Sequence, residues 1–275
     1  WLKMPNAEVL SWVRSRFMPH IWCPGCGHGV IMHAIIRALI GIGADRKNTV
    51  LASGIGCSSR MAGYINACTL HSTHGRSLAF ATGIKLHRPE LTVVDVMGDG
   101  DCTAIGGNHF IHACRRNIDI TAIVMNNNIY GMTGGQASPT TPFGAWASTT
   151  PFGAIDPAFD ICRLAEGAGA SYVARTTIAN PRQAETYITN GIRKKGFSVI
   201  EVVTHCHTQF GRKNNRRLPI ENYNFFKEAS IPLAKAQTMS PEELEGRIVC
   251  GEFVNKDVPE YTEQYQKLVI DKVRG

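Results

Sequence analysis

Residues 91–101 read LTVVDVMGDGD, an apolar run that ends in an acidic turn rich in glycine. The apolar part, 91–97, is nearly continuous rather than alternating, which is typical of a parallel strand covered on both faces. A second such run, 120–126, leads into the polar turn NNNIYG at 126–131. Open parallel sheets bind ligands outside the carboxyl ends of their strands, so the two turns mark the edge where we expect a site.

Strand-like and helix-like segments alternate outward from this pair of runs. Further strands are expected at 49–53, 171–175 and 197–204, and helices at about 28–41, 58–66, 75–88, 106–116, 157–168 and 180–195. The last helix has a clear start, because Asn180 is a good capping residue and Pro181 suits the first helical position. The pattern predicts an α/β fold in which helices cover both faces of a parallel sheet.

Two stretches depart from this alternation. Residues 131–156 are rich in Gly, Pro, Ser and Thr, and a loop of this length inside a compact domain is usually functional or covers a site. From about residue 211 the periodicity fades and charges of both signs intermix. We therefore expect one ligand-binding domain over 1–210 and a C-terminal extension over 211–275 that wraps the core or a partner.

Composition narrows the classes of protein. The chain has 275 residues, of which 44% are hydrophobic and 19% charged, so a large buried core is expected and wholesale disorder is excluded. The formal charge of +7 suits a phosphate-bearing cofactor or an acidic protein partner. No basic run is interleaved with aromatic residues, so we expect no nucleic-acid partner. The longest apolar stretch, 30–42, contains His33 and Arg37 and is too short to span a bilayer, so no membrane contact is expected.

The polar turns at the strand ends have the residue types of a diphosphate site. Gly98 and Gly100 let the backbone approach a diphosphate closely. Asp99 and Asn127 offer hard oxygen ligands for a Mg²⁺ ion that would bridge the phosphates. The alternative is a pair of ordinary strand-end turns, since Gly, Asp and Asn favour turns. The Asn cluster lies far enough beyond Asp99 for one helix and one strand, which favours the site.

Cysteines form a second constellation. The count of nine is odd and the chain is too long to need disulfides, so we expect a cytoplasmic protein with reduced thiols, some of which bind a metal. Cys23 and Cys26 form a Cys-x-x-Cys pair, which alone suits zinc, a redox dithiol or half of an iron–sulfur site. Zinc ribbons usually carry a second such pair. Here two isolated cysteines, Cys57 and Cys206, each follow a strand instead, which favours a [4Fe–4S] cluster held by four thiolates. The remaining cysteines, at 68, 102, 114, 162 and 250, are expected to be core thiols.

Several motifs in one order resemble the β subunits of the 2-oxoacid:ferredoxin oxidoreductases, which bind thiamine diphosphate. They are WCPGCGHG at 22–29, the stretch 98–107, RRN at 115–117, the stretch 130–141 and QFGR at 209–212, and together they cover roughly residues 20–215. The motif YGMTGGQ at 130–136 is most similar to that of enzymes of the 2-oxoglutarate type. The motif of enzymes that act on branched-chain 2-oxoacids is similar as well.

The resemblance implies an enzyme that is active only with its α subunit. It would decarboxylate a 2-oxoacid to its acyl-CoA and CO₂ with reduction of ferredoxin, or catalyse the reverse carboxylation. The 2-oxoacid that the resemblance favours is 2-oxoglutarate. The implied cofactors are thiamine diphosphate, Mg²⁺ and a [4Fe–4S] cluster, with coenzyme A as co-substrate. The alternatives are a 2-oxoisovalerate or pyruvate enzyme, a cluster-free thiamine-dependent decarboxylase or synthase, and a zinc-stabilised binding protein.

The same resemblance assigns residues within a thiamine diphosphate-binding domain over 1–210. It implies a cluster on Cys23, Cys26, Cys57 and Cys206, and Mg²⁺ on Asp99, Asn127 and the backbone carbonyl of Ile129. Thiamine diphosphate would contact Ile55, Gly56, Cys57, Ser58, Gly100, Asp101, Gly131 and Met132. The loop around Cys57 would then touch the cofactor and ligate the cluster at once, which makes the electron path short.

Three basic features remain. Arg60 follows Cys57 by three positions and is a candidate to hold a substrate carboxylate in two hydrogen bonds, the alternative being a helix residue paired with a nearby acid. His74 opens a helix in a Thr-His-Gly-Arg turn, where it could hydrogen-bond a phosphate or the substrate; the other histidines are expected to be structural. A basic run, Arg212, Lys213, Arg216 and Arg217, fits a contact with ferredoxin, coenzyme A or the companion subunit, and a solvated face is the simpler alternative.

Overall fold

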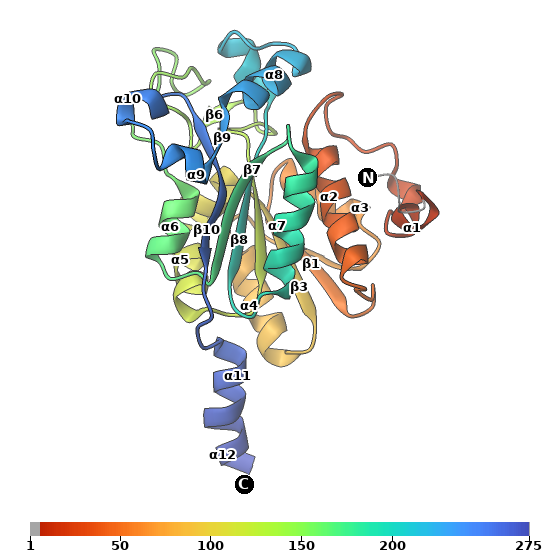
Figure 1. Cartoon of the computed structure of the whole chain (residues 1–275). Coiled ribbons are helices and arrows are strands. Elements are labelled where there is room, and N and C mark those ends of the chain that lie inside the picture. Colours follow the sequence, from red (N-terminus) through yellow and green to blue (C-terminus); the bar gives the residue numbers. More distant parts are fainter. Residues whose placement is uncertain (1–5, 275) are drawn as a thin grey trace.

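An eight-stranded sheet runs through the middle of the molecule, with helices on both of its faces (Figure 1). The computed structural model describes residues 6–274. In sheet order the strands are β2 (Cys68–His71), β1 (Thr49–Ser53), β3 (Thr92–Gly98), β4 (Thr121–Asn126), β8 (Ser198–Val203), β7 (Tyr172–Thr177), β10 (Ile248–Asn255) and β9 (Ser230–Pro232). Neighbours from β2 to β7 pair in parallel. β10 pairs antiparallel with β7, and β9 pairs in parallel with β10, so these last two strands run opposite to the others.

Helices cover the two faces in separate sets. One face carries α2 (His28–Gly41), α3 (Met61–Tyr64) and α7 (Pro181–Arg193), and the other carries α4 (Ser77–His87), α5 (Gly107–Arg116) and α6 (Ile161–Gly167). Successive residues of a strand point to opposite faces. In β4, Ile123 joins the core under the first set, whereas Ala122 and Val124 join the core under the second. The predicted α/β fold with a doubly covered parallel sheet is confirmed.

Most predicted elements match the structure within one or two residues. The five predicted strands are β1, β3, β4, β7 and β8. Asn180 caps α7 as predicted, since its side chain accepts a hydrogen bond from Gln183 N at 3.3 Å. The prediction at 157–168 was wrong at its start, because the Asp160 side chain accepts from Arg163 N at 3.1 Å and so begins α6 only at Ile161. The helix predicted at 58–66 is instead a 3-10 turn, Ser58–Arg60, followed by α3.

Elements that the sequence pattern did not predict lie at the edges and in the loops. The short edge strand β2 is only partly buried, so it lacks the apolar run of the central strands. β5 (Ile129–Tyr130), just before the loop 131–156, forms a small hairpin with β6 (Gln136–Ala137) inside that loop. The other short elements are α1 (Asn6–Ser11), a 3-10 turn at Ser15–Phe17, and π-helical turns at Asp101–Ile105, His207–Gly211 and Gln266–Ile270.

The chain after residue 211 adds to the same sheet. It forms α8 (Pro219–Ala229), β9, α9 (Leu233–Ala236), α10 (Pro241–Leu244), β10, α11 (Tyr261–Tyr265) and α12 (Asp271–Arg274). In β10, Gly251 lies opposite Arg175 of β7. The last helical residues project away from the body as an arm (Figure 1).

Four of the predicted ligand segments follow parallel strands of this sheet, whereas the segment with Cys23 and Cys26 precedes α2. Because β1, β3, β4 and β8 run in one direction, the segments after Ser53, Gly98, Asn126 and Val203 emerge at one edge. Within residues 6–274, no helix combines the length and the apolar character needed to cross a membrane.

Candidate functional site

Asp99, directly after β3, has a buried carboxylate whose two oxygens both accept hydrogen bonds from neighbouring residues. It is 2% exposed. Its Oδ2 accepts hydrogen bonds from Thr140 Oγ1, at 2.7 Å, and from Ser138 Oγ, while Oδ1 accepts a longer one from Asn127 N, at 3.4 Å. Burial raises the pKa of Asp99 above its usual range, which a bound cation would oppose. The two loop hydroxyls therefore hold one oxygen and leave the other turned toward Asn127.

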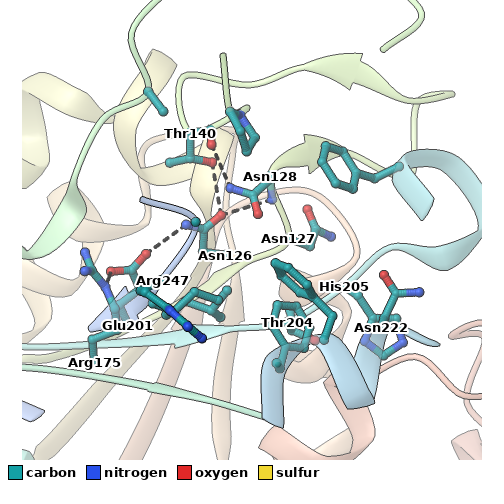
Figure 2. A pocket seen from close by; sticks show the side chains of 18 of the residues that line it. Asn126, Asn127, Asn128, Thr140, Arg175, Glu201, Thr204, His205, Asn222 and Arg247 are labelled. Carbon is teal, nitrogen blue, oxygen red and sulfur yellow. Dashed lines mark hydrogen bonds and ion pairs between the residues drawn. The ribbon is translucent and has the colours of Figure 1, made fainter. Parts of the chain in front are cut away.

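The turn that follows β4 is fixed by the same loop. Asn128 has a φ of +61°, in the left-handed region that Asn tolerates. Its Nδ2 donates to Thr140 O at 2.6 Å, and Asn127 Oδ1 accepts from Ile129 N at 3.3 Å. Figure 2 shows Asn126, Asn127, Asn128 and Thr140 grouped at the ends of the strands. The side chain of Asn127 and the backbone of Ile129 are thus brought to the same place.

Glycines keep the floor of this site open. A Cβ added at Gly100 would clash with the ring of Tyr130, whose hydroxyl donates to Gly100 O at 3.3 Å. A Cβ added at Gly131 would lie 3.2 Å from Cys206 Sγ. Side chains at these two positions would crowd Tyr130 and Cys206. Gly100 is one of the two glycines predicted to admit a diphosphate, and Gly131 is one of the residues expected to contact the cofactor.

A cavity of about 80 Å³ lies between these turns. Its wall holds all eight residues expected to contact thiamine diphosphate, the three expected to hold Mg²⁺, and His74. The full set is His28, Ile55, Gly56, Cys57, Ser58, His74, Gly98, Asp99, Gly100, Asp101, Met125, Asn127, Ile129, Tyr130, Gly131, Met132 and Thr133. Ligand sites commonly measure about 300–1,000 Å³. The enclosed space therefore suits the charged end of a cofactor whose remainder extends outside it. We call it the cofactor cavity.

Asp101 is held in the cofactor cavity by three partners. Its Oδ1 accepts from Gly75 N at 2.7 Å and from Ile55 N at 3.3 Å, and it pairs with His74 Nδ1. Its Oδ2 is buried and has no hydrogen-bond partner among residues 6–274. A free buried acceptor of this kind is unusual and suits a ligand that donates a hydrogen bond. His74 therefore acts on the site through Asp101 and also borders the cavity.

The four cysteines assigned to a cluster meet in a neighbouring cavity of about 370 Å³. Its wall consists of Ile21, Trp22, Cys23, Cys26, His28, Cys57, Asn127, Gly131, Met132, His205, Cys206, His207, Thr208 and Gln209. We call it the cysteine cavity. Burial, with the neighbouring cysteines adding to it, raises the pKa of Cys26 to about 12 and that of Cys57 to about 11. A metal centre would replace those protons, and four converging sulfurs are a fitting donor set for one.

The two cavities share part of their walls. His28, Cys57, Asn127, Gly131 and Met132 border both. At Gly131 the wall has no room for a larger side chain, since a Cβ there would lie 3.2 Å from Cys206 Sγ and 3.9 Å from Asn127 Nδ2. The predicted diphosphate site and the predicted cluster site are therefore neighbours, separated by residues that line both cavities.

Arg60 is not brought into either cavity. It is exposed and absent from both walls. The charge of Arg60 lies near His71. Burial is the main cause that lowers the pKa of His71, and the positive charge of Arg60 lowers it further. Sequence reasoning did not single out three further site residues, Tyr130, Ser138 and Thr140. Ser138 and Thr140 lie in a loop rich in Ser and Thr, where nothing in the sequence distinguishes them from ordinary turn residues.

A third cavity, of about 480 Å³, opens beyond the ends of β4, β8 and β7 (Figure 2). A chain of hydrogen bonds runs from it toward Asp99. Asn126 Nδ2 donates to Glu201 Oε1 at 2.8 Å, and Asn126 Oδ1 lies 3.0 Å from Thr140 Oγ1, whose single hydrogen is shared between it and Asp99 Oδ2. Because Thr140 also contacts Asp99, the interior of the sheet is linked to the proposed metal ligand.

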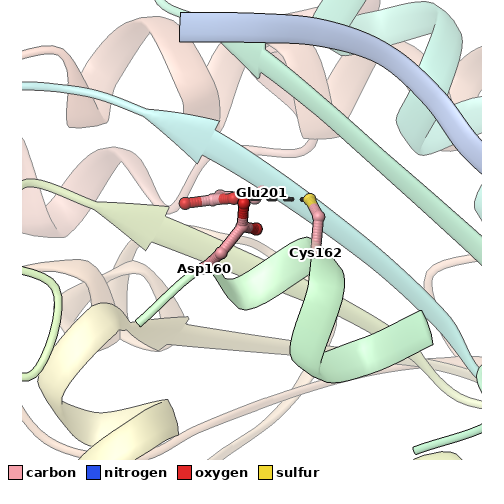
Figure 3. Close-up of side chains that lie close together, drawn as sticks. All are labelled: Asp160, Cys162 and Glu201. Carbon is pink, nitrogen blue, oxygen red and sulfur yellow. Dashed lines mark hydrogen bonds between the residues drawn. The ribbon is translucent and has the colours of Figure 1, made fainter. Parts of the chain in front are cut away.

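Asp160, Cys162 and Glu201 place their ligand atoms within 4.8 Å of one another (Figure 3). The arrangement has metal-ligand chemistry, yet Arg175 already supplies the positive charge. Its Nε lies 2.6 Å from Glu201 Oε2, and its NH2 group pairs with Asp160 Oδ1. Glu201 is 2% exposed, so this guanidinium neutralises a buried carboxylate. We therefore interpret the group as a structural ion pair.

Comparisons with known proteins agree with this geometry. The family described as "Thiamine pyrophosphate enzyme, C-terminal TPP binding domain" matches residues 54–202. The chain is 53% identical over 261 residues to 2-oxoglutarate synthase subunit KorB of Methanocaldococcus jannaschii, covering 95% of this chain and 97% of the relative. The relative of that name from Archaeoglobus fulgidus is 49% identical over 263 residues, covering 96% and 95%. A solved structure of 2-oxoglutarate:ferredoxin oxidoreductase from Magnetococcus marinus, with 2-oxoglutarate, coenzyme A and succinyl-CoA bound, matches with a TM-score of 0.86 at 30% identity, over 100% of this chain and 94% of that chain.

The buried ion pair yields a prediction about stability. Arg175→Met leaves the Glu201 carboxylate buried without its partner, so the free energy of unfolding should fall by about 3–5 kcal/mol, measured by urea denaturation. Arg88→Met is the matched control, because Arg88 and Glu90 form an exposed pair and the loss should be within error. Equal effects of the two substitutions would show that the buried pair is not a stability determinant.

Proposed function

This chain belongs to the β subunits of the 2-oxoglutarate:ferredoxin oxidoreductases, and from that membership we propose how its two adjoining cavities divide the work of the enzyme. The cofactor cavity holds the diphosphate of thiamine diphosphate with its Mg²⁺, and the cysteine cavity holds a [4Fe–4S] cluster. The observation that carries the proposal is the shared wall of the two cavities, because an electron donor in one and an electron acceptor in the other would lie side by side.

We assign Mg²⁺ to three oxygens at the strand ends. Asp99 Oδ1, Asn127 Oδ1 and the carbonyl of Ile129 are hard donors of the kind that Mg²⁺ prefers. Support comes from the saturation of Asp99 Oδ2 by Thr140 and Ser138, which leaves Oδ1 for a cation. Gly56, Ser58, Gly100 and the other residues predicted to contact the cofactor border the same cavity. Thiamine diphosphate supplies the carbanion chemistry when bound, and the chain binds, orients and shields it.

We assign the cluster to Cys23, Cys26, Cys57 and Cys206. All nine cysteines are free thiols in the structure, which suits a reducing compartment such as the cytoplasm. The proposed ligands of both sites fall between residues 23 and 206. We therefore propose 1–210 as the cofactor-binding domain and 211–275 as an extension whose strands widen the sheet.

The cofactor cavity needs a second subunit. Thiamine enzymes generally use a glutamate to activate the aminopyrimidine ring, and the residues that line this cavity include none. We propose that the companion α subunit supplies it. Coenzyme A then accepts the acyl group, and ferredoxin accepts the electrons from the cluster.

We propose 2-oxoglutarate as the 2-oxoacid and succinyl-CoA as the product. Support comes from the names of the relatives, which are 2-oxoglutarate synthases, and from the Magnetococcus enzyme, which was solved with these two compounds. The second carboxylate of 2-oxoglutarate needs a cation, because burial unpaired would be costly. Arg60 is our candidate, since it is exposed and free to face a substrate held between two subunits. The left-handed Gly134 and Gly135, with φ of +112° and +88°, keep the adjacent loop free of side chains.

The cluster assignment predicts which cysteines hold iron. In the complex purified anaerobically with its companion subunit, Cys57→Ala and Cys206→Ala should each lose most of the iron and acid-labile sulfide, because each removes one of four thiolates. Cys68→Ala and Cys250→Ala are the controls and should retain both. Full iron retention in the first pair would refute the assignment. Zinc without iron in the wild type would indicate a zinc-stabilised protein, and activity without either metal a cluster-free enzyme.

The Mg²⁺ assignment predicts the effect of Asp99→Ala on cofactor binding. Loss of even an outer partner of a metal ligand costs roughly 10–100-fold in affinity, so loss of the ligand itself should cost more than ~100-fold. Fluorescence titration of the complex with thiamine diphosphate at saturating Mg²⁺ measures this. Asp95→Asn is the control, because Asp95 is buried in β3, the strand that precedes Asp99, but does not border the cavity. Unaltered affinity in Asp99→Ala would remove Asp99 from the site.

The substrate assignment predicts a selective loss in Arg60→Met. The kcat/KM for 2-oxoglutarate should fall by roughly 10²-fold, the scale of a lost charged hydrogen bond. Pyruvate, which lacks the distal carboxylate, should lose much less. An equal loss on both substrates would place Arg60 at the shared 2-oxoacid carboxylate or at the cofactor. A wild-type preference for 2-oxoisovalerate would overturn the substrate itself.

A further inference from the structure

His28 contacts one of the proposed cluster ligands through a defined ring nitrogen. Its Nδ1 lies 2.8 Å from Cys26 Sγ, within hydrogen-bond distance. It is the first residue of α2 and is 1% exposed, so water does not compete for this contact. From the sequence, His28 is expected to be one of several structural histidines. The structure distinguishes it from them, because it contacts the sulfur of a proposed cluster ligand.

The ring of His28 is held in place by Trp22. The two ring centroids lie 5.7 Å apart, and Trp22 Nε1 donates to the backbone oxygen of Cys57 at 2.6 Å. Trp22 therefore connects the histidine ring to the backbone of a second proposed ligand. Rotation of the imidazole away from Cys26 would break this packing in a fully buried region.

The direction of the hydrogen bond follows from the chemistry of the ligand. A cysteine that ligates a cluster is a thiolate and carries no proton. In the loaded protein, Cys26 Sγ can only accept, so the hydrogen must sit on Nδ1 of His28. Reduction adds negative charge to the cluster and its sulfurs, and a hydrogen-bond donor stabilises that charge. Hydrogen bonds to the sulfurs are one of the factors that set the potential of iron–sulfur clusters.

We propose that His28 is a positioning residue that raises the reduction potential of the cluster by donating its Nδ1–H to Cys26 Sγ. The inference rests on the cluster assignment made above. Its place in the molecule gives it a role, because His28 borders both the cysteine cavity and the cofactor cavity. The donor of the hydrogen bond is thus a residue that lies between the proposed cluster site and the proposed cofactor site. A higher potential favours entry of the electron and makes its transfer onward to ferredoxin less favourable.

Thr208 is a second and weaker donor to the same sulfurs. Its Oγ1 lies 3.5 Å from Cys206 Sγ and 3.8 Å from Cys23 Sγ. One hydroxyl carries one hydrogen, so it can serve only one of the two thiolates at a time. Its distances are longer than that of His28, and its contribution to the potential should be the smaller of the two.

The test compares two substitutions by redox titration of the αβ complex, with the reduced cluster followed by electron paramagnetic resonance. His28→Leu removes the donor and should lower the potential by about 59 mV, which corresponds to a tenfold change in a one-electron equilibrium. In His28→Asn the amide Nδ2 occupies the position of the imidazole Nδ1, so most of the potential should return. His33→Leu is the control, because His33 lies on the same helix outside both cavities and should leave the potential unchanged.

An unchanged potential in His28→Leu would overturn the proposal, and so would an equal fall in His28→Asn. If His28→Leu fails to retain its cluster, the hydrogen bond is tested in the wild-type complex instead. Pulsed electron paramagnetic resonance of reduced protein containing ¹⁵N-histidine should show a ¹⁵N coupling that disappears in His28→Asn, and its absence from the wild type would refute the hydrogen bond. Absence of iron from the wild type would instead refute the cluster assignment.

Discussion

Parallel pairing in close register is the constraint on which the site depends. Ser53 lies opposite Val96, Gly98 opposite Met125, and Asn126 opposite Val203. The four strands β1, β3, β4 and β8 therefore end within a few residues of one another. Segments that are far apart in the chain leave the sheet side by side, and a shift of register would separate them. These departing segments form the two cavities together with residues of the stretch 21–28 and His74.

The long loop after β5 converts the strand ends into a fixed site. Polar groups buried without partners are costly, so the carboxylate of Asp99 requires donors. Ser138 and Thr140 supply them from the loop, and Thr140 also contacts Asn126, which in turn donates to Glu201. Arg175 closes this network inside the sheet. The proposed metal ligand is thereby oriented by contacts that reach from the loop to the core.

The shared wall between the cavities has a consequence for electron transfer. A Cβ added at Gly131 would lie 3.2 Å from the sulfur of Cys206 and 3.9 Å from the amide nitrogen of Asn127. A side chain at this position would therefore crowd the Cys206 sulfur. Cys57 contributes to both walls from one turn, and His28 does so from the start of α2. Electrons leaving the cofactor would thus meet a ligand of the cluster without crossing a further layer of protein.

By itself the sequence determined the α/β class and the five central strands, and it singled out the candidate cofactor and cluster residues that the structure places in the walls of the two cavities. Continuous apolar runs can be read locally because burial on both faces excludes most polar residues, and the glycine and Asp positions, with Cys57 and Cys206, come shortly after those runs. The edge strand β2, the hairpin in the loop and β10 escaped that reading, since partly exposed strands carry mixed patterns. Only the tertiary structure decided which donors orient Asp99, that Arg60 lies outside both cavities, and that His28 faces a cysteine sulfur. Those outcomes depend on contacts between segments distant in the chain, for which the local pattern of residues carries no signal.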